Sequence, residues 1–519
     1  MQTIFDQSQS NSSIEQADPK MNSVLEISRS DAVPGLHPKS IAETYLNQVL
    51  THVAPVPLAE NHSPIDVFNP ADGKLIGQIN ALGEENVGAA VRAATIALAD
   101  WRCLLPRERG SYLQKWCELI VQNSEELACL MTLEQGKPLD DARGEIAYAA
   151  SFFKWFAEET NRLYGEVIPA HLPDKTMLVK QQPIGIVAAI TPWNFPSAML
   201  ARKASAALAA GCTVIAVPSK VTPYSALALQ YLAEQAGLPT GVFTVLTGHS
   251  RELVAALFTH TAVRAVSYTG STEVGRNIMA QCADTVKRVS LELGGHAPFI
   301  IYADAELDKA VEGAIAAKFQ TGGQDCLAAN RIYVHRAIYD RFLTQFVNAT
   351  RALVVGDGFE KDTIIGPLAT MDTLKKSQAH IADAVEKGAR LLCGGTQPAA
   401  GGLYYQPTVL ADVTHQMKIA VEETFGPVAA IIPFDDDDDV LSLANDTEYG
   451  LVAYAYTTCA KRIQALPDQL EYGMVAINTA KLTGAPIPFG GMKQSGIGRE
   501  GSRLGILEFT EPQYACIQR

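Results

Sequence analysis

Three side chains capable of chemistry lie where the chain is expected to turn, and the first is a cysteine. Cys326 lies in FQTGGQDCLAANR, just after a predicted helix and a Gly-Gly pair that allows the backbone to turn sharply. A cysteine on such a loop can present its sulfur to a ligand, whereas the more common fate of cysteine is burial as a small apolar residue. Asp325 argues against a reactive thiol, because a neighbouring carboxylate disfavours the thiolate.

The other two are a carboxylate and an amide at predicted strand ends. Glu292 ends the strand-like segment VSLELGG, where an acid is well placed for a cleft, and the alternative is an exposed strand-end charge. Asn194 lies in TPWNFP, in the turn after another predicted strand. Its amide either caps the following helix or donates a hydrogen bond to a developing oxyanion. The residues themselves leave both pairs of alternatives open.

Phosphate and metal sites have weaker support. The segment 270–275, GSTEVG, follows a predicted strand and opens a helix, so its amides could hold a pyrophosphate, but its spacing is not G-x-G-x-x-G. The acidic run 435–439 is interpreted as a solvated loop and helix start, with a metal site as the minor alternative. The histidines, His260 and His296 among them, show no ligand spacing, so we predict no metal site.

The elements that must position these residues alternate between strand and helix from residue 183 to residue 295. IGIVAAI (184–190) is predicted to be a buried strand, and 198–211 an Ala-rich helix that ends at its glycine. Further strands and helices alternate up to VKRVSLELGG, which predicts a mainly parallel sheet with helices on both faces. Ligands of such sheets bind at the carboxyl ends of the strands, so we expect the chemistry there.

Two other regions show recognisable patterns. Residues 296–480 continue the strand–helix style, and no internal repeat is present. A helix is predicted to begin near Glu84, with four residues roughly on one face: Val87, Val91, Ile96 and Leu98.

Composition restricts the class of protein. A chain of 519 residues predicts two or three domains, and its net charge of −14 argues against a nucleic-acid partner. Nine cysteines without C-x-x-C pairs indicate a reducing compartment, so we expect a cytoplasmic protein. No apolar run reaches the ~20 residues of a membrane helix, so no membrane partner is expected. Residues 1–60 are interpreted as a polar extension, neither signal nor transit peptide, whose order is left open.

Six motifs occur together in the order and approximate spacing of one family. They are TPWNFP, YTGSTEVG, LELGG, GGQDC, EETFGP and PFGGMKQSGIGRE. In this combination the chain resembles the aldehyde dehydrogenase superfamily over residues 65–519. The stretches MTLEQGKPL, GEIAYAASFFKWFAEE and ANDTEYGL look most like the succinate-semialdehyde dehydrogenase branch.

The resemblance implies catalytic roles. Cys326 matches the nucleophile, which forms a thiohemiacetal with the aldehyde and, after hydride transfer to a nicotinamide, a thioester. The Asn194 amide and the Cys326 backbone N–H match the oxyanion donors. Glu292 matches the general base that activates water, and Lys203 and Glu500 match a supporting pair.

The resemblance also implies a cofactor site. Glu423 and Phe425 match residues that hold the nicotinamide ribose, and Trp193 matches a cofactor-side wall. Ser271 matches a diphosphate contact, with Gly270 beside it in the same site.

One cofactor segment departs from the family pattern. In the segment Val217-Pro218-Ser219-Lys220, Val217 replaces a lysine that contacts the adenosine ribose. Lys220 replaces the glutamate that binds the ribose 2′-hydroxyl in NAD-preferring members, and we place it with Ser219 in the cofactor site. Because a lysine can pair with a 2′-phosphate, we expect NADP to be accepted and favour it over NAD. The alternative is that losing both contacts weakens cofactor binding.

The substrate pocket departs too. The branch has two arginines and a serine around the distal carboxylate; Arg202 matches one arginine, Gln320 replaces the other, and Thr483 stands at the serine. Glutamine is only a neutral dipole, but we still place an ω-oxo acid, such as succinic or glutaric semialdehyde, first. A broad aliphatic and aromatic range is the alternative. Thr321 also replaces the family's asparagine five residues before the nucleophile.

Other classes of function remain as alternatives. A non-catalytic relative with a binding or structural role is one, although Cys326, Glu292 and Asn194 are all present. A CoA-acylating enzyme is disfavoured because such enzymes usually lack the base at Glu292.

The implied fold is α/β with three parts. They are a doubly wound cofactor-binding domain (61–161 and 184–292), an α/β catalytic domain (293–480) and a β oligomerisation arm (162–183 and 500–519). The arm implies a homodimer or homotetramer.

Overall fold

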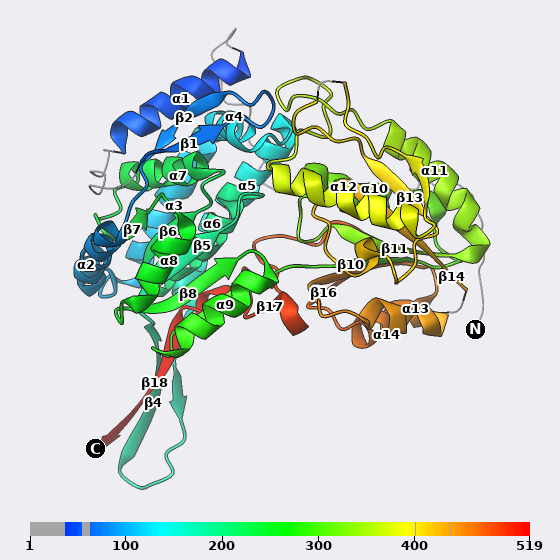
Figure 1. Ribbon diagram of the computed structural model, residues 1–519. Coiled ribbons are helices and arrows are strands. Elements are labelled where there is room, and N and C mark those ends of the chain that lie inside the picture. The colour runs from blue at the N-terminus through cyan, green and yellow to red at the C-terminus, as the bar shows by residue number, and fades with distance from the viewer. Residues whose placement is uncertain (1–36, 54–62, 400, 436, 519) are drawn as a thin grey trace, which may run out of the picture.

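Two parallel sheets, one in each lobe of the molecule, carry the fold, and a narrow arm projects from the first lobe (Figure 1). The structure is a computed structural model, and it describes residues 37–53, 63–399, 401–435 and 437–518. Most of the predicted N-terminal extension, residues 1–36 and 54–60, therefore lies outside the described residues. None of the helices in the described ranges is long and apolar enough to cross a bilayer.

The first lobe contains a six-stranded sheet in the order β17-β9-β8-β5-β6-β7, parallel except for β17. Its strands are β5 (Ile186–Thr191), β6 (Thr213–Pro218), β7 (Phe243–Val245), β8 (Val263–Thr269), β9 (Arg288–Glu292) and β17 (Gly496–Ile497). The intervening helices are α6 (Pro196–Ala210), α7 (Pro223–Gln235), α8 (Ser250–Thr259) and α9 (Thr272–Ala283). The predicted parallel sheet is confirmed.

The central strand β5 explains why this part of the sequence is apolar without a break. Side chains on a strand alternate between its two faces. Val187 and Ala189 accordingly join the core on one face, whereas Ile186, Ala188 and Ile190 join the core on the other. A strand covered on both faces must be apolar at every position. The predicted helix after it ends at Gly211, whose φ of 97° suits glycine.

The second lobe contains a seven-stranded sheet in the order β12-β13-β14-β11-β10-β15-β16, in which only the β12–β13 pair is antiparallel. Its strands are β10 (Ala297–Ile301), β11 (Ala329–His335), β12 (Arg390–Cys393), β13 (Thr408–Ala411), β14 (Val428–Phe434), β15 (Val452–Tyr456) and β16 (Met474–Ile477). Its helices are α10 (Leu307–Phe319), α11 (Tyr339–Arg351), α12 (Met371–Glu386), α13 (Asp437–Asn445) and α14 (Ala460–Gln469). Separate hydrophobic cores cover its two faces.

The N-terminal part adds helices and a hairpin to the first lobe. They are α1 (Pro38–His52), β1 (Ile65–Phe68), β2 (Leu75–Ile79), α2 (Glu84–Trp101), α3 (Pro106–Gln122), α4 (Ser124–Gln135) and α5 (Leu139–Glu159). Helix α2 begins where predicted, but Ile96 is 74 % exposed, so its assignment to the buried face was wrong. The reason is geometric: at about 100° per residue, Ile96 lies opposite Val87 on the helix.

Helix α1 shows that part of the predicted polar extension is folded. Its buried residues Ala42, Tyr45, Leu46 and Val49 are spaced three and four apart, and they pack with α4 and α7. This amphipathic spacing was present in the sequence, but it is short and flanked by polar residues. Residues 38–52 of the predicted extension are therefore a folded helix of the first lobe.

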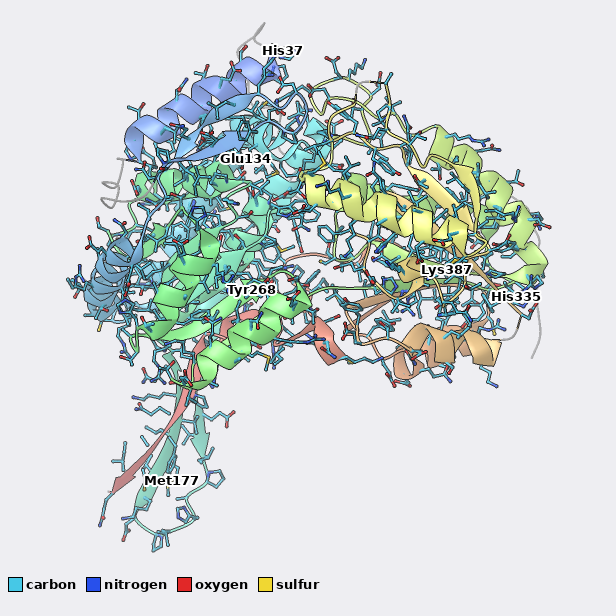
Figure 2. All side chains as sticks on the ribbon, in the orientation of Figure 1. His37, Glu134, Met177, Tyr268, His335 and Lys387 are labelled. Carbon is cyan, nitrogen blue, oxygen red and sulfur yellow. The ribbon has the colours of Figure 1, made fainter. Side chains whose placement is uncertain are left out.

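The arm is a three-stranded antiparallel sheet that extends away from the lobe. Its strands are β3 (Glu166–Ile168), β4 (Lys175–Pro183) and β18 (Thr510–Gln518). In Figure 2, Met177 lies on this arm, away from Tyr268 in the body of the first lobe. The predicted C-terminal arm segment starts too early, because α15 (Ser502–Leu507) packs on α5 and α6 in the lobe. Ile506 and Phe509 belong to the first lobe's core, which holds this part of the chain down.

Candidate active site

The candidate catalytic residues meet between the two lobes. In the first sheet the chain runs from β5 outward through β6 and then returns to β8, so β5 lies at the point where the strand order reverses. Asn194 follows β5, Gly270 and Ser271 follow β8, and Glu292 ends β9. All of them therefore lie at the carboxyl edge of the first sheet, where the sequence predicted the chemistry.

Cys326 approaches from the other lobe and corrects that expectation. It lies on the loop that enters β11, at the amino end of a strand of the second sheet. Gly295, three residues beyond Glu292, touches this loop so closely that a Cβ on Gly295 would collide with the Cys326 carbonyl. The carboxyl edge of one sheet thus faces the amino edge of the other, an arrangement that only the packing of the lobes creates.

A cavity of about 360 Å³ opens onto the Cys326 thiol. It brings together three residues that the sequence assigned to the substrate: Arg202, Gln320 and Thr483. Its wall also contains side chains that the sequence analysis did not single out: Tyr148, Phe195, Tyr454, Lys481 and Phe489. Most of them are aromatic, so the cavity combines an apolar body with a few polar groups, as ligand pockets usually do.

The thiol is neutral in the resting site. Cys326 is 7 % exposed, and burial raises its pKa well above the ordinary value; the charges of Glu292 and Asp325 raise it further. The predicted objection from Asp325 is therefore correct in direction, but burial is the larger cause. A base must take up the thiol proton before the sulfur can attack.

Glu292 has the properties of such a base. Its side chain is 2 % exposed, and burial raises its pKa to about 8, although Arg202 and Lys203 oppose the shift. Within the described residues, neither carboxylate oxygen of Glu292 accepts a hydrogen bond. Buried polar groups are nearly always paired, so an unpaired buried carboxylate whose charge acts on the Cys326 thiol indicates function. The alternative of an exposed strand-end charge is wrong.

Asn194 does not cap the helix that follows it. Its Nδ2 donates to the carbonyl of Gln324 at 3.0 Å, which fixes the amide beside the loop that carries Cys326. Glu145 caps α6 instead, since its Oε1 accepts hydrogen bonds from the backbone N–H groups of Ser197 at 2.9 Å and Ala198 at 3.1 Å. Of the two roles predicted for the amide, the helix cap is wrong, and the oxyanion role stays a prediction.

A buried ion pair positions the Asn194 backbone. Lys137 Nζ lies 2.6 Å from Glu145 Oε2 and donates to the Asn194 carbonyl at 2.8 Å. It also lies 4.2 Å from the centre of the Phe195 ring. The sequence analysis missed both residues, although they lie in the stretches MTLEQGKPL and GEIAYAASFFKWFAEE that carried the resemblance. The charges of Lys137 and Glu145 within those two stretches were the sign in the sequence that could have led to them.

The predicted pair of Lys203 and Glu500 is in contact, and Arg202 joins it. Lys203 Nζ contacts one Glu500 oxygen, and Arg202 Nε contacts the other. Burial opposes the charge of Glu500, but Arg202 and Lys203 outweigh it and hold the pKa of this carboxyl below its ordinary value. Lys203 also donates to Ser267 Oγ at 3.2 Å. The charges of Arg202, Lys203 and Glu500 all act on the Glu292 carboxyl group.

The loop before Cys326 turns as its glycines predicted. Gly322 and Gly323 have φ values of 64° and 73°, in the left-handed region that glycine adopts without strain. Thr321 shares this conformation with a φ of 50°, although its branched side chain is poorly suited to it. Gln324 returns hydrogen bonds from its backbone N and Nε2 to the Thr321 carbonyl, which closes the turn.

The predicted cofactor residues lie along the same edge of the first sheet. Glu423 Oε1 accepts from the Gly295 N–H at 3.1 Å, and burial raises the pKa of this carboxyl to about 7. The Phe425 ring meets the Trp193 ring edge-on at 5.5 Å. Ser271 caps α9 through a hydrogen bond from the Val274 N–H.

These groups fit a nucleotide cofactor. Thr269, at the end of β8, keeps a buried hydroxyl without a hydrogen-bond partner in the described structure. Beside it the free N–H groups at the start of α9 can receive a diphosphate. At the end of β6, Lys220 is exposed, whereas Val217 is fully buried within the sheet and presents nothing to a ribose.

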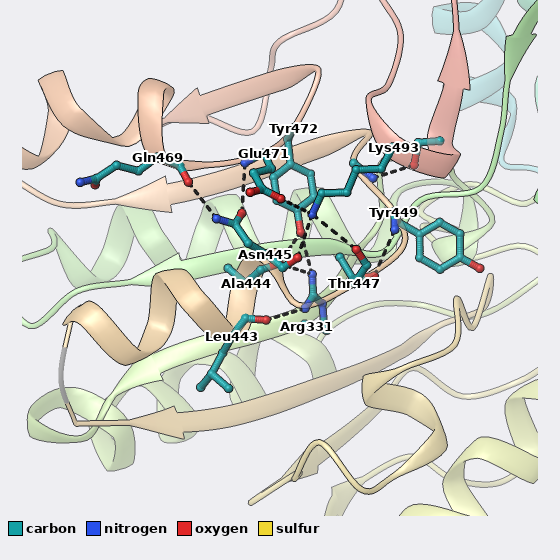
Figure 3. A network of polar contacts seen from close by, with 12 residues as sticks. Arg331, Leu443, Ala444, Asn445, Thr447, Tyr449, Gln469, Glu471, Tyr472 and Lys493 are labelled. Atoms are coloured by element: carbon teal, nitrogen blue, oxygen red, sulfur yellow. Dashed lines mark hydrogen bonds and ion pairs between the residues drawn. The ribbon is translucent and has the colours of Figure 1, made fainter.

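A polar network of the second lobe, which Figure 3 shows around Arg331, Asn445 and Lys493, connects through Ser495 to the chain that follows Glu292. Arg331 donates to two carbonyls in the last turn of α13, at 3.0 and 2.9 Å. Lys493 donates to the Asn445 carbonyl at 2.8 Å and so anchors the segment that contains Ser495. Ser495 Oγ in turn donates to the Gly294 carbonyl at 2.7 Å. The second lobe thereby fixes the end of the strand that carries the candidate base.

Comparisons with known proteins agree with this geometry. Residues 58–515 match the family model described as "Aldehyde dehydrogenase family". The succinate-semialdehyde dehydrogenase [NADP(+)] GabD of Escherichia coli is 51 % identical over 88 % of this chain and 95 % of its own length. The glutarate-semialdehyde dehydrogenase of Pseudomonas aeruginosa is 50 % identical over the same shares. The crystal structure of an E. coli NADP-dependent enzyme superposes with a TM-score of 0.88 at 51 % identity, covering 89 % of this chain and 96 % of that one.

Proposed function

The chain belongs to the aldehyde dehydrogenase family, and from that premise we propose that it oxidises an ω-oxo acid, such as succinic or glutaric semialdehyde, to the dicarboxylate. The observation that supports this most directly is Cys326, which lines a cavity and whose thiol pKa is raised by the charge of an unpaired buried carboxylate, Glu292.

The residues divide the work as follows. Cys326 attacks the aldehyde carbon once Glu292, directly or through water, has taken its proton. The developing oxyanion is held by the Cys326 N–H and by the Asn194 Nδ2 group, whose second N–H remains after the bond to Gln324. A nicotinamide held beside Glu423 and Phe425 would supply the acceptor for the hydride, and loss of that hydride converts the Cys326 thiohemiacetal to a thioester. Glu292 then releases the thiol proton to solvent and removes a proton from the water that hydrolyses the Cys326 thioester, so that the carboxylate product leaves and the sulfur is set free as the thiolate. Lys203 with Glu500 stabilises charge near that base.

We propose NADP as the preferred cofactor. The related enzyme from E. coli is named for NADP. Lys220 supports the same choice, because an exposed ammonium at the end of β6 can pair with a 2′-phosphate and no glutamate there repels it. Comparing kcat/KM for NADP and NAD tests this, and a large preference for NAD contradicts it.

We also propose a homo-oligomer, a dimer or tetramer, in the cytoplasm. The arm supports the first part, because its exposed apolar side chains, Val167, Tyr514 and Ile517 among them, lie on strands that leave the lobe. The free thiols of the nine cysteines support a reducing compartment. Light scattering of the purified chain tests the oligomeric state.

The decisive experiment for the function is the turnover of succinic semialdehyde with NADP. The parent should form reduced cofactor, and Cys326→Ser should lose at least about a thousandfold in kcat, because an alcohol is a far weaker nucleophile than a thiolate. A Cys326→Ser variant as active as the parent rejects the thioester mechanism. No turnover by the parent with any aldehyde supports instead a non-catalytic role.

A broad aldehyde range is the second candidate, favoured by the aromatic wall of the cavity and by the neutral Gln320. Hexanal and benzaldehyde measured beside succinic semialdehyde separate the two. Higher kcat/KM for the neutral aldehydes makes the broad range the better description.

A further inference from the structure

The distal carboxylate of an ω-oxo acid needs a positive partner, and the cavity offers few charges. Among the described residues that line it, three carry a formal charge: Arg202, Asp325 and Lys481. Asp325 is buried beside the nucleophile and has the wrong sign. The choice is therefore between Arg202 and Lys481, and it rests on the proposed function, since only an anionic substrate requires it.

Arg202 is already committed to the protein. Its Nε contacts Glu500, and its Nη2 lies 2.9 Å from the sulfur of Met199. Its guanidinium also stacks over the ring of Phe489 at 4.1 Å. A carboxylate that took Arg202 side-on, through Nε and Nη2, would have to displace Glu500, a buried charge that would then lose a partner.

Lys481 is free to bind a ligand. Its side chain is exposed, and in the part of the chain that the structure describes its ammonium has no ion-pair or hydrogen-bond partner. Its backbone is fixed: the Lys481 N–H donates to Thr479 Oγ1 at 3.1 Å. The base of the loop is pinned to the second sheet, where Asn478 exchanges hydrogen bonds with the backbone of Thr457 at 2.9 and 3.0 Å. The Lys481 ammonium is thus unpaired among the described residues, whereas hydrogen bonds hold the backbone of the loop that carries it at the cavity wall.

We propose that Lys481 is the specificity residue of this enzyme, which binds the distal carboxylate of the substrate, with the hydroxyl of Thr483 on the same loop as a second contact. Lys481 supplies the cation that Gln320 lacks. Because a lysine is a point charge on a flexible stem rather than a planar fork, it can follow the carboxylate of chains that differ by a methylene. Succinic and glutaric semialdehyde should therefore be used with similar efficiency, within about fivefold.

The test compares substrates that differ only at the distal end. Succinic semialdehyde and butanal have the same carbon chain, with a carboxylate or a methyl group at its end. In the parent the ratio of their kcat/KM values should favour the acid. Lys481→Met should lower this ratio by about tenfold, mainly through the KM of the acid, and Lys481→Arg should restore most of it. Raising the ionic strength should increase the KM of the acid for the parent and not for Lys481→Met.

A matched control removes the same charge elsewhere. Lys461 is an exposed lysine on α14 that does not line the cavity, so Lys461→Met should keep the parental ratio. Equal ratios for Lys481→Met and Lys461→Met overturn the assignment. A parent that prefers butanal rejects the proposed substrate class instead, and a parent that prefers the acid while Lys481→Met keeps that preference rejects Lys481 alone. Loss of the preference in Arg202→Met together with its retention in Lys481→Met assigns the carboxylate to Arg202.

Discussion

Two buried polar clusters, one of Lys137 and Glu145 and the other around Glu292, differ in how completely their charges are paired. In the first, Lys137 has Glu145 and the Asn194 carbonyl as partners, and Glu145 also caps α6. In the second, Glu292 lies beside Cys326 with neither carboxylate oxygen hydrogen-bonded within the described structure. We call the cluster of Lys137 and Glu145 closed, because its charges are paired, and the cluster around Glu292 open, because its carboxylate is not; the three side chains are all buried.

The difference separates structural from chemical work. A buried charge with good partners is held in a single geometry, and removing one partner leaves the other uncompensated. A buried charge without partners destabilises the folded state, but its pKa is raised into the range where a base operates. The closed cluster should therefore control stability and the open cluster the rate, and the following variants test this separation.

Glu292→Gln should have the largest effect, and it should fall on the rate. Loss of a general base lowers kcat by about a hundred- to ten-thousandfold. Because Glu292 also takes up the thiol proton, the formation of reduced cofactor in the first turnover should slow together with steady-state turnover, and stopped-flow measurements should show no rapid burst.

The stability of Glu292→Gln should not fall. The folded-state pKa of Glu292 is raised from 4.5 to about 8, so ionisation of this buried group costs stability progressively as the pH rises between these values. The variant should thus match the parent in Tm at low pH and equal or exceed it at high pH. A clear decrease in Tm contradicts the open-cluster description.

Lys137→Met should show the converse. It leaves Glu145 buried without its cation, which should lower the free energy of unfolding by ~3–5 kcal/mol. Denaturant unfolding measures this loss. The double variant Lys137→Met/Glu145→Gln removes both charges and should recover part of the stability, which excludes a simple loss of packing at Lys137. Equal destabilisation in the single and double variants counts against the closed cluster.

The pH dependence of hydrolysis should follow the open cluster. Only ionised Glu292 acts as a base, so with a pKa of about 8 the rate should rise with pH below that value and level off above it. The slope should approach tenfold per pH unit on the acid side. Single-turnover hydrolysis of the thioester measures it, and the same plot should be flat for Glu292→Gln. A parental profile that is already flat between pH 6 and 8 assigns the proton transfer to another group.

Thr321→Asn should have the smallest effect of these variants, an increase in the free energy of unfolding. It tests whether backbone strain in the loop before Cys326 also reduces stability. Thr321 is buried with a φ of 50°, a conformation that asparagine tolerates better than a β-branched residue. The substitution should raise the free energy of unfolding by ~1 kcal/mol. Thermal unfolding measures it, with Thr321→Val as a control that keeps the branched shape and the strain.

Much of the fold follows from the sequence because its causes are local. Unbroken apolar runs such as 184–190 and helices that end in glycine predict a parallel sheet covered on both faces, and the structure confirms it. The three residues Cys326, Glu292 and Asn194 left their roles open by themselves, and it was the resemblance carried by six ordered motifs that named the chemistry. Two predictions were wrong: α1 was expected to be part of a polar extension, and Ile96 was expected on the buried face of α2.

Only the tertiary structure decided which of these residues meet and which are free to act. Cys326 reaches Glu292 because the amino edge of one sheet packs against the carboxyl edge of the other, a contact between residues distant in sequence. Arg202 matched a substrate ligand by its position, yet its Nε contacts Glu500, while the Lys481 ammonium at the cavity wall has no partner among the described residues. A sequence specifies the charge of each side chain, but its pKa and its partners depend on burial and on neighbours that the folded chain alone provides.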